Sequence, residues 1–280
     1  MIISTDSTSN LPKEFYLKND IKTIPMQIIL DEEVYDDLSE NLPSCEFCKK
    51  MREGSNPKTA QINRENATKY FEELLKTNQD ILHISFSSEL SGTTAGMFEI
   101  ANQLNKTHKN QITVIDTLNA SAGEGLFVIK ALEMKNEGKT VEEIANYLNS
   151  NRLKFRSFFT VDNLKYLVRG GRIGKFSGIV GSLLKIKPVL KVDEKGRLVS
   201  YKKVISRKKS INELAKICIE KAVPKHVLIC HADCLEDAEN LANLVENELH
   251  VSPQIIDLTQ VICSHSGPGT LAIFFMDKNM

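Results

Sequence analysis

The chain has 280 residues, and its 36 Lys and Arg residues balance 36 Asp and Glu residues, so the formal net charge is zero. With 41% hydrophobic and 26% charged residues, it has the composition of a folded globular protein, which argues against an acidic disordered tail or a basic nucleic-acid coat protein. Its apolar runs are too short to cross a bilayer, and residues 1–10 lack the pattern of a signal peptide. We therefore expect one large or two medium domains in the cytoplasm.

The first half alternates predicted strands with predicted helices. Strands are predicted at residues 2–5, 24–30, 81–86 and 112–115, and helices from residue 11 and at 45–52, 63–77, 91–105, 120–136 and 141–148. The acidic stretch 31–40 is predicted to be a loop, and Thr140 with Glu143 indicates a capping box. Strands separated by helices of this length indicate a parallel sheet with crossover connections.

The second half has a different order of predicted strands and helices. Strands are predicted at residues 157–161, 188–192, 197–204, 226–231 and 254–258, and helices at 162–168, 208–221 and 235–249. A Gly/Pro turn at 266–270 precedes a final apolar segment at 271–276. The second and third of these strands are spaced as a hairpin. The sequence therefore predicts an α/β protein of two domains, a parallel-sheet α/β domain at residues 1–155 and a mixed-sheet α+β domain at 156–280.

The zero net charge conceals a segregation of charge along the chain. Residues 151–210 hold 17 basic side chains against Asp162, Asp193 and Glu194, a net charge of +14, so the other 220 residues sum to −14. A basic segment of this kind favours an anionic ligand, a phosphate or an acidic partner, and a solvated basic face remains the plain alternative.

The six cysteines do not predict a metal site. Cys45 and Cys48 lie one turn apart in a helical pattern, and Cys230 and Cys234 bracket His231 about 180 residues later. Compact zinc modules hold their ligand pairs in tight turns that lie close together in sequence, so we interpret these cysteines as reduced thiols.

Three polar segments, two of them directly after a predicted strand, are candidates for ligand binding. Ser91 and Gly92 open a helix, whose free N–H groups favour a carboxylate or a phosphate, although Ser91 as a plain N-cap explains the same pattern. Thr59 and Gln61 lie in a polar turn. His265, beside a glycine turn, is suited to donate to an anion or to act as an acid or base, and a structural histidine is the alternative.

Arg169 and Arg172 flank two glycines and present guanidinium groups shaped for a bidentate grip on a phosphate or carboxylate. The chain contains neither the GxGxxG nor the GxxxxGK[ST] nucleotide motif, and neither the GxSxG nor the HExxH catalytic motif. The sequence therefore points to binding rather than to a recognisable catalytic centre.

Several segments, considered together, resemble the DegV family: STDSTSNLP, PKTAQ, SSELSGTT, LKYLVRGGRIGKFSG, LLKIKPVL and HSGPGTLAIFF. They extend over essentially the whole chain. The resemblance implies a two-domain protein of the FakB type that binds a long-chain fatty acid, such as palmitate or oleate, without a cofactor or metal and without being an enzyme itself. It also implies a separate fatty acid kinase subunit, with ATP and magnesium, that converts the bound acid to acyl phosphate for phospholipid synthesis.

The same resemblance implies roles for particular residues. The N-terminal domain would contribute carboxylate-binding residues and the C-terminal domain would enclose the acyl chain, with transient membrane-surface contact and no nucleic acid. The implied ligand-binding residues are Thr59, Ser91, Gly92 and His265, and the implied contacts to the kinase or the phosphoryl group are Arg169, Arg172 and Arg207. Residues 59–63 read TAQIN where the family usually has TSQPS, so Thr59 and Gln61 are retained.

Burial of an acyl chain requires an apolar tunnel. Its candidate lining residues are Phe158, Phe159, Ile179, Leu183, Leu184, Ile186, Leu190, Phe274 and Phe275. Two functions of other classes stay open. One is a stand-alone hydrolase or phosphotransferase that uses His265 with Ser91 or Ser266, and the other is a nucleic-acid binder that uses the basic segment.

Overall fold

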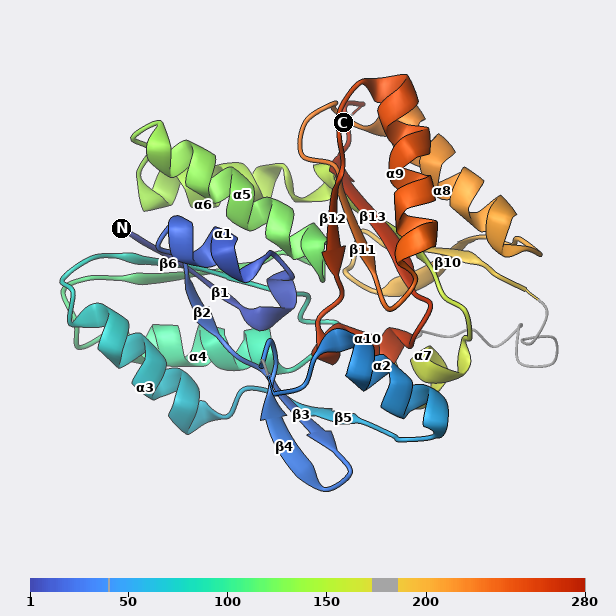
Figure 1. Ribbon diagram of the computed structural model, residues 1–280. Coiled ribbons are helices and arrows are strands. Elements are labelled where there is room, and N and C mark those ends of the chain that lie inside the picture. The colour runs from blue at the N-terminus through green and yellow to red at the C-terminus, as the bar shows by residue number, and fades with distance from the viewer. Residues whose placement is uncertain (40, 173–185, 280) are drawn as a thin grey trace.

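A parallel sheet organises the N-terminal part of the computed structural model, which describes residues 1–39, 41–172 and 186–279. Its strand order is β2 (Lys22–Ile24), β1 (Ile2–Asp6), β6 (Ile81–Ser85) and β7 (Ile112–Asp116). Helices α3 (Arg64–Leu75) and α4 (Thr93–Leu104) cover one face, and α5 (Ala122–Asn136) and α6 (Val141–Ser150) cover the other (Figure 1). Strands β1 and β6 are buried throughout because both of their faces are covered.

A mixed sheet of six strands forms the second layer. Its order is β10 (Leu198–Lys202), β9 (Val189–Val192), β8 (Phe155–Thr160), β13 (Leu271–Met276), β11 (Leu228–His231) and β12 (Gln254–Asp257). Helices α8 (Arg207–Lys221) and α9 (Leu235–Leu249) pack on its outer face (Figure 1), where Phe158 and Phe275 are buried. The predicted α/β class with a parallel and a mixed sheet is confirmed.

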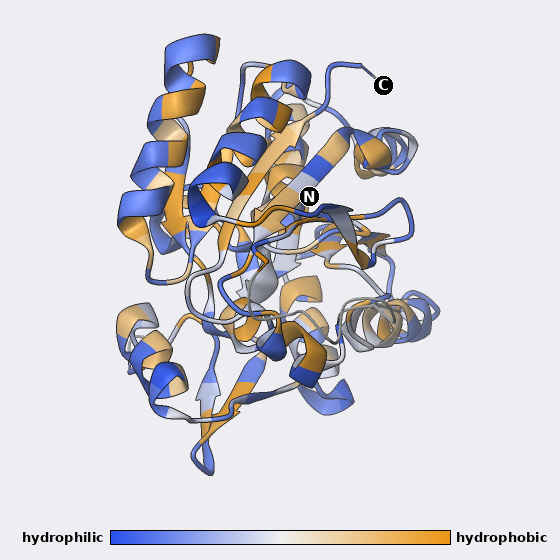
Figure 2. Ribbon diagram, turned by 90° about the vertical axis from the view of Figure 1, so that its right-hand side faces the viewer, coloured by the Kyte–Doolittle hydropathy of each residue, from blue (hydrophilic) through white to orange (hydrophobic). Residues whose placement is uncertain are grey.

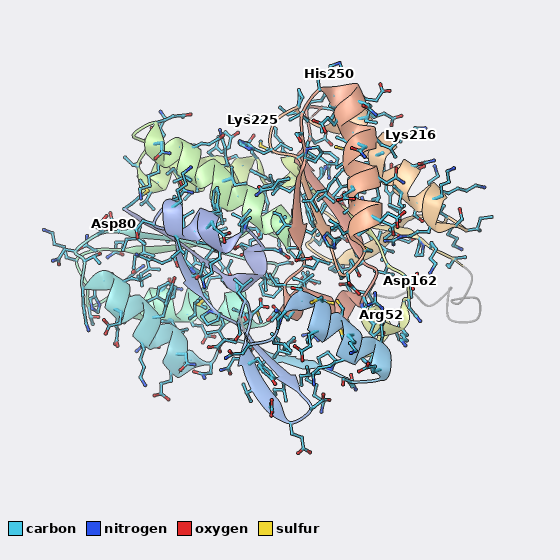
Figure 3. The ribbon with its side chains drawn as sticks, viewed as in Figure 1. Arg52, Asp80, Asp162, Lys216, Lys225 and His250 are labelled. Carbon is cyan, nitrogen blue, oxygen red and sulfur yellow. The ribbon has the colours of Figure 1, made fainter. Side chains whose placement is uncertain are left out.

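Helix α5 joins the two layers because it packs on β1 and β6 on one side and on β8 and β13 on the other. The rings of Phe127 on α5 and Phe155 on β8 stack with centroids 3.9 Å apart. Glu133 on α5 also accepts a hydrogen bond from Lys225, which Figure 3 labels at this junction. Figure 2 shows the hydrophobic residues concentrated along the inner strands and the inward faces of the helices.

The acidic segment 31–40 was predicted to be a loop, and this prediction is wrong. Strands β3 (Gln27–Leu30) and β4 (Glu33–Asp36) form a projecting hairpin (Figure 1), and β5 (Lys58–Ala60), also predicted as a turn, pairs with β3. Asp31 and Glu32 both have positive φ, as the two-residue turn of such a hairpin requires. Asp is favoured at such positions but Glu32 is an unusual choice. The predicted strand 24–30 is divided at Pro25 and Met26.

Four short helices complete the described structure: α1 (Lys13–Lys18), α2 (Ser44–Glu53), α7 (Lys165–Gly170) and α10 (Gln260–Ser266), together with 3-10 turns at Ser7–Ser9 and Arg152–Lys154. The sequence did not predict α10. It packs on α2, where the sulfur atoms of Cys48 and Cys263 lie 3.6 Å apart. Near them, Arg52 on α2 forms an ion pair with Asp233 (Figure 3).

Two helix starts agree with their sequence signals. Thr140 and Glu143 form the predicted capping box of α6, and Ser206 caps α8 by accepting from the backbone N–H of Lys209. No helix within the described residues has the length and apolar character that a membrane span needs. The described part of the chain likewise contains no cluster of three or more His, Cys, Asp or Glu residues placed to hold a metal ion.

Candidate functional site

A cavity of about 250 Å³ lies against the inner face of the mixed sheet, below the loops that follow β6 and β7. Most of its wall is apolar, which suits a narrow hydrophobic ligand. The apolar lining residues are Met26, Phe86, Leu90, Ala120, Phe159, Leu167, Val192, Leu198, Leu258, Val261, Ile262, Ala272 and Phe274. The other lining residues are Thr59, Gln61, Ser91, Gly92, Ser121, Ser157, Arg172, His265, Ser266 and Thr270.

Thr59 and His265 meet at this cavity although 206 residues separate them in the chain. The Thr59 hydroxyl and Nε2 of His265 are 2.8 Å apart. Strand β5 presents Thr59, and α10, which packs against β3 and β5, presents His265. The small antiparallel sheet that the sequence did not predict is therefore what brings this pair together.

His265 is held neutral. Burial, together with the positive charges of Arg172 and Arg169, lowers its pKa to about 4. Its Nδ1 is buried without a hydrogen-bond partner among the described residues, and it lies against Gly170, where any added Cβ would approach Nδ1 to 2.5 Å. Nε2 is thus the ring atom engaged in hydrogen bonding with Thr59, and the tautomer of the ring sets which of the two groups donates.

Ser91 and Gly92 lie at the same wall of the cavity. The Ser91 hydroxyl donates to Thr93 Oγ1 at 3.1 Å and accepts from the Thr93 backbone N–H at 3.2 Å, so it acts as a local cap one residue before Gly92, the N-cap of α4. A Cβ on Gly92 would collide with the amide oxygen of Gln61. Glycine therefore allows the segment after β5 to approach the start of α4, which joins the two polar segments.

Of the three arginines implied by the resemblance, only Arg172 lines the cavity. Its Nε donates to the Leu90 carbonyl at 3.1 Å and its Nη1 donates to the Gly170 carbonyl at 2.6 Å. Arg169 stacks over the ring of Tyr166 at 5.3 Å. Arg207 pairs with Asp237 at 2.8 Å, away from the cavity wall, so the structure does not bring it together with Thr59 and His265.

The proposed lining of the tunnel is right at two positions. Phe159 and Phe274 line the cavity, whereas Phe158 and Phe275 point to the opposite face of the mixed sheet and pack under α8 and α9. The prediction overlooked that alternate residues of a strand face opposite sides. Leu190 and Ile186 pack in the core outside the cavity wall. Three further candidates, Ile179, Leu183 and Leu184, lie outside the described residues.

The geometry does not favour a Ser–His dyad. His265 Nε2 is engaged by Thr59, the Ser266 hydroxyl donates to the Ile262 carbonyl at 3.1 Å, and Ser91 donates to Thr93. Each hydroxyl that the hydrolase hypothesis needed therefore already has another acceptor. In the described part of the cavity, His265 serves as a hydrogen-bonding group and not as a base next to a serine nucleophile.

Sequence reasoning missed two serines of the cavity wall. Ser121 precedes α5 and Ser157 lies on β8. A signal was available for Ser121, because the segment 119–125, NASAGEG, is another run of small residues that follows a strand and opens a helix. Ser157 had no comparable signal, since only the pairing of β8 with β13 turns it inward.

A second buried polar cluster lies behind the cavity, around the STDST segment. All four carboxylate oxygens of Asp6 and Glu124 accept hydrogen bonds from the hydroxyls or backbone N–H groups of Thr5, Thr8, Ser85 and Phe86. Burial raises the pKa of both carboxyls, and the charge of Asp6 raises that of Glu124 further. The cluster supports Phe86, whose side chain lines the cavity.

Fold and cavity together describe an α/β protein with a parallel sheet, a mixed sheet and a small antiparallel sheet, which encloses a mostly apolar cavity with a polar end. The sequence model of DegV, described as an uncharacterised protein family, matches residues 1–278. A DegV domain-containing protein of Clostridium perfringens is 38% identical, covering 98% of this chain and 97% of its own length. The chain belongs to the DegV family.

Solved structures of the family are closely similar. The fatty-acid-binding DegV family protein from Thermus thermophilus superposes with a TM-score of 0.89 at 29% identity, covering 99% of both chains. DegV from Bacillus subtilis, a fatty acid binding protein, gives a TM-score of 0.86 at 29% identity, again covering 99% of both chains. A DegV lipid binding protein from Thermotoga maritima gives 0.87 at 31% identity, covering 99% of this chain and 98% of its own.

Proposed function

We propose that this protein binds one long-chain fatty acid, with the acyl chain in the cavity and the carboxylate at its polar end. One observation carries the proposal: the mostly apolar cavity has three hydrogen-bonding side chains in its wall, Thr59, Ser91 and His265. The fatty-acid-binding relatives from Thermus thermophilus and Bacillus subtilis support the choice of ligand.

The energetics require a preformed dry cavity. Burial of about 14 methylenes at about 0.8 kcal/mol each yields roughly 11 kcal/mol, and association costs about 4–15 kcal/mol, so a ligand without a prepared cavity would bind weakly. The carboxylate needs donors in that setting. In this proposal neutral His265 carries its proton on Nε2 and donates to the Thr59 oxygen, which directs the Thr59 proton to the carboxylate.

In this proposal the protein is a carrier and not a catalyst. It presents the carboxylate to a separate fatty acid kinase in the cytoplasm, which supplies ATP and magnesium and forms acyl phosphate for phospholipid synthesis. The missing nucleotide motifs support catalysis on a partner. Arg169 and Arg207, outside the cavity wall, belong to the basic segment that would meet an acidic kinase surface or the phosphoryl group.

The direct test is the lipid content of the purified protein. Organic extraction followed by mass spectrometry is expected to yield about one fatty acid per chain, because a single cavity holds the ligand. An extract without fatty acid, together with no binding of palmitate or oleate in titration, would overturn the proposal. Turnover of an ester or phosphate without any partner would favour the hydrolase alternative instead.

The carrier role has its own test with Arg172→Ala. The variant is expected to retain fatty acid binding but to form acyl phosphate more slowly with a fatty acid kinase, because Arg172 is tied to two backbone carbonyls at the cavity edge. Loss of fatty acid binding in this variant would mean that Arg172 holds the ligand itself.

A further inference from the structure

Two serine hydroxyls interrupt the apolar wall of the cavity. Ser121 and Ser157 are each only 4% exposed, and both line the cavity. Ser157 pairs with Phe274 on β13, whereas Thr270 precedes that strand on the side of α10. Four residues of strand span about 13 Å, so Ser157 lies well along the acyl chain from His265. Buried hydroxyls that face hydrocarbon cost free energy unless they are hydrogen-bonded.

The Ser157 hydroxyl must donate its proton to the protein. Asn119 uses its Nδ2 to donate to the Phe155 carbonyl at 3.0 Å, which turns its Oδ1 toward Ser157. That oxygen accepts from the Ser157 hydroxyl at 2.5 Å and from the Ala120 N–H at 3.1 Å. Because an amide oxygen can only accept, the direction of the bond from Ser157 is determined.

Ser121 is arranged in the same way by a different asparagine. Nδ2 of Asn10 donates to the Asp257 carbonyl at 2.8 Å, so its Oδ1 accepts from the Thr259 N–H at 3.1 Å and from the Ser121 hydroxyl at 3.1 Å. The proton of each serine is therefore committed to an asparagine. What each hydroxyl retains for the cavity is a lone pair, which can only accept a hydrogen bond.

We propose that the protein selects long-chain acids that carry a hydroxyl group on the acyl chain, with the ligand hydroxyl donating to Ser157 in the distal part of the cavity or to Ser121. The proposal rests on the proposed function and names its substrate class. A saturated acid would leave both serine lone pairs facing methylenes. An oxo acid would place a third acceptor against them, so the site distinguishes a hydroxyl from a carbonyl at the same carbon.

Competitive titration against a fluorescent fatty acid tests this inference. The probes are stearic acid, monohydroxystearic acids with the hydroxyl on successive carbons of the distal half, and the oxostearic acid that matches each one. At least one hydroxy isomer is expected to bind about 3- to 10-fold more tightly than stearic acid, the ratio of a net neutral hydrogen bond. The matching oxo acid is expected to bind no more tightly than stearic acid.

Ser157→Ala and Ser121→Ala identify the acceptor. The relevant variant, or the double variant, is expected to abolish the preference for the hydroxy acid while retaining or improving stearic acid binding. Ser210→Ala is the matched control, because Ser210 is a buried serine outside the cavity, bonded to the Lys187 carbonyl. Thermal melting of each variant verifies that it is folded.

The outcomes distinguish failure of this inference from failure of the proposed fatty acid binding. Tight stearic acid binding with no hydroxy isomer preferred would overturn the inference and leave the proposed function standing. Equal gains from hydroxy and oxo acids would also overturn it, because the serines would then be donors. Failure of every acid to bind would overturn the proposed function itself.

Discussion

The protein buries two clusters of polar side chains, one around Asp6 and Glu124 and one around Thr59 and His265. They differ in whether their polar atoms find hydrogen-bond partners within the protein. In the first cluster all four carboxylate oxygens have donors from the protein. In the second, Thr59 and His265 bond to each other beside a cavity, and Nδ1 of His265 has no partner among the described residues. Both arise from segments rich in hydroxyl residues.

The comparison indicates how a binding site differs from a structural network. A network whose bonds close on themselves adds rigidity, and it has nothing left to offer a ligand. A network that ends at a cavity retains groups that a ligand can satisfy. Hydroxyl-rich sequence is common to both clusters. What distinguishes a structural cluster from a binding site is whether its hydrogen-bonding groups are paired within the protein or face the cavity.

The largest effect is expected from breaking the closed cluster. Glu124→Ala removes one of the acceptors of Thr5 and of Thr8 and leaves a cavity, so the free energy of unfolding should fall by roughly 3 kcal/mol. Urea denaturation measures it, with the exposed Glu142→Ala on α6 as the control. Fatty acid affinity of the folded variant should change less than about twofold. Lost affinity at unchanged stability would place this cluster in the binding site.

The two clusters should respond to pH in opposite directions. The pKa of His265 is lowered from 6.5 to about 4, so the unfolded chain binds more protons in this range and stability falls as pH drops from 6.5 to 4. The loss is at most about 3 kcal/mol. The pKa values of Asp6 and Glu124 are raised above their ordinary values of 3.8 and 4.5. Their contribution to folding stability is therefore fully present below those values and declines as pH rises through the folded-state pKa values.

Two variants separate these pH dependences. His265→Asn should flatten the acid side of the stability profile, and Glu124→Gln should flatten the decline toward higher pH, both measured by denaturation across the pH range. If either variant reproduced the wild-type profile, the group it replaces would not be the one that titrates.

Removal of one hydroxyl tests whether the open cluster binds ligand. Thr59→Val keeps the shape of the side chain but removes the donor, and hydrogen bonds to charged groups contribute about 1.5–3 kcal/mol, so fatty acid affinity should fall by about 10-fold or more. Fluorescent fatty acid titration measures the loss. An affinity equal to that of the wild type would show that the carboxylate binds elsewhere.

The smallest effect is expected at Thr160, a buried threonine of β8 that belongs to neither cluster. Its hydroxyl has no partner among the described residues. Thr160→Val should leave fatty acid affinity unchanged and raise the free energy of unfolding by about 1 kcal/mol, because an unsatisfied buried hydroxyl becomes a methyl group. A loss of stability would reveal an acceptor for it, such as a buried water. The variant is also the matched control for Thr59→Val.

Much of the fold could be predicted from local patterns. The helix Leu235–Leu249 has the predicted limits, the apolar segment 271–276 coincides with a strand, and the capping signals at Thr140 and Ser206 mark true helix starts. These signals act within one or two turns of chain, so no distant residue is needed to interpret them. The hairpin after Gln27 and helix α10 were missed, because the hairpin turn has Glu32 where glycine or asparagine is usual and the helix is only seven residues long.

The candidate site was predicted in part. Thr59, Ser91, Gly92, Arg172 and His265 all line the cavity, and their roles in binding remain predictions. Ser121 and Ser157 were missed because strand pairing and two distant asparagines determine where their hydroxyls point.

The sequence by itself determined the α/β class, a parallel sheet followed by a mixed sheet, and the polar segments available for a site, because periodicity, capping and turn chemistry act over a few residues. Only the tertiary structure decided which polar residues close on one another and which face a cavity. That choice depends on contacts between residues as distant as Thr59 and His265, and on amide orientations set by Asn10 and Asn119. Hydrogen bonds are directional, so the same hydroxyl residues can support a fold or receive a ligand.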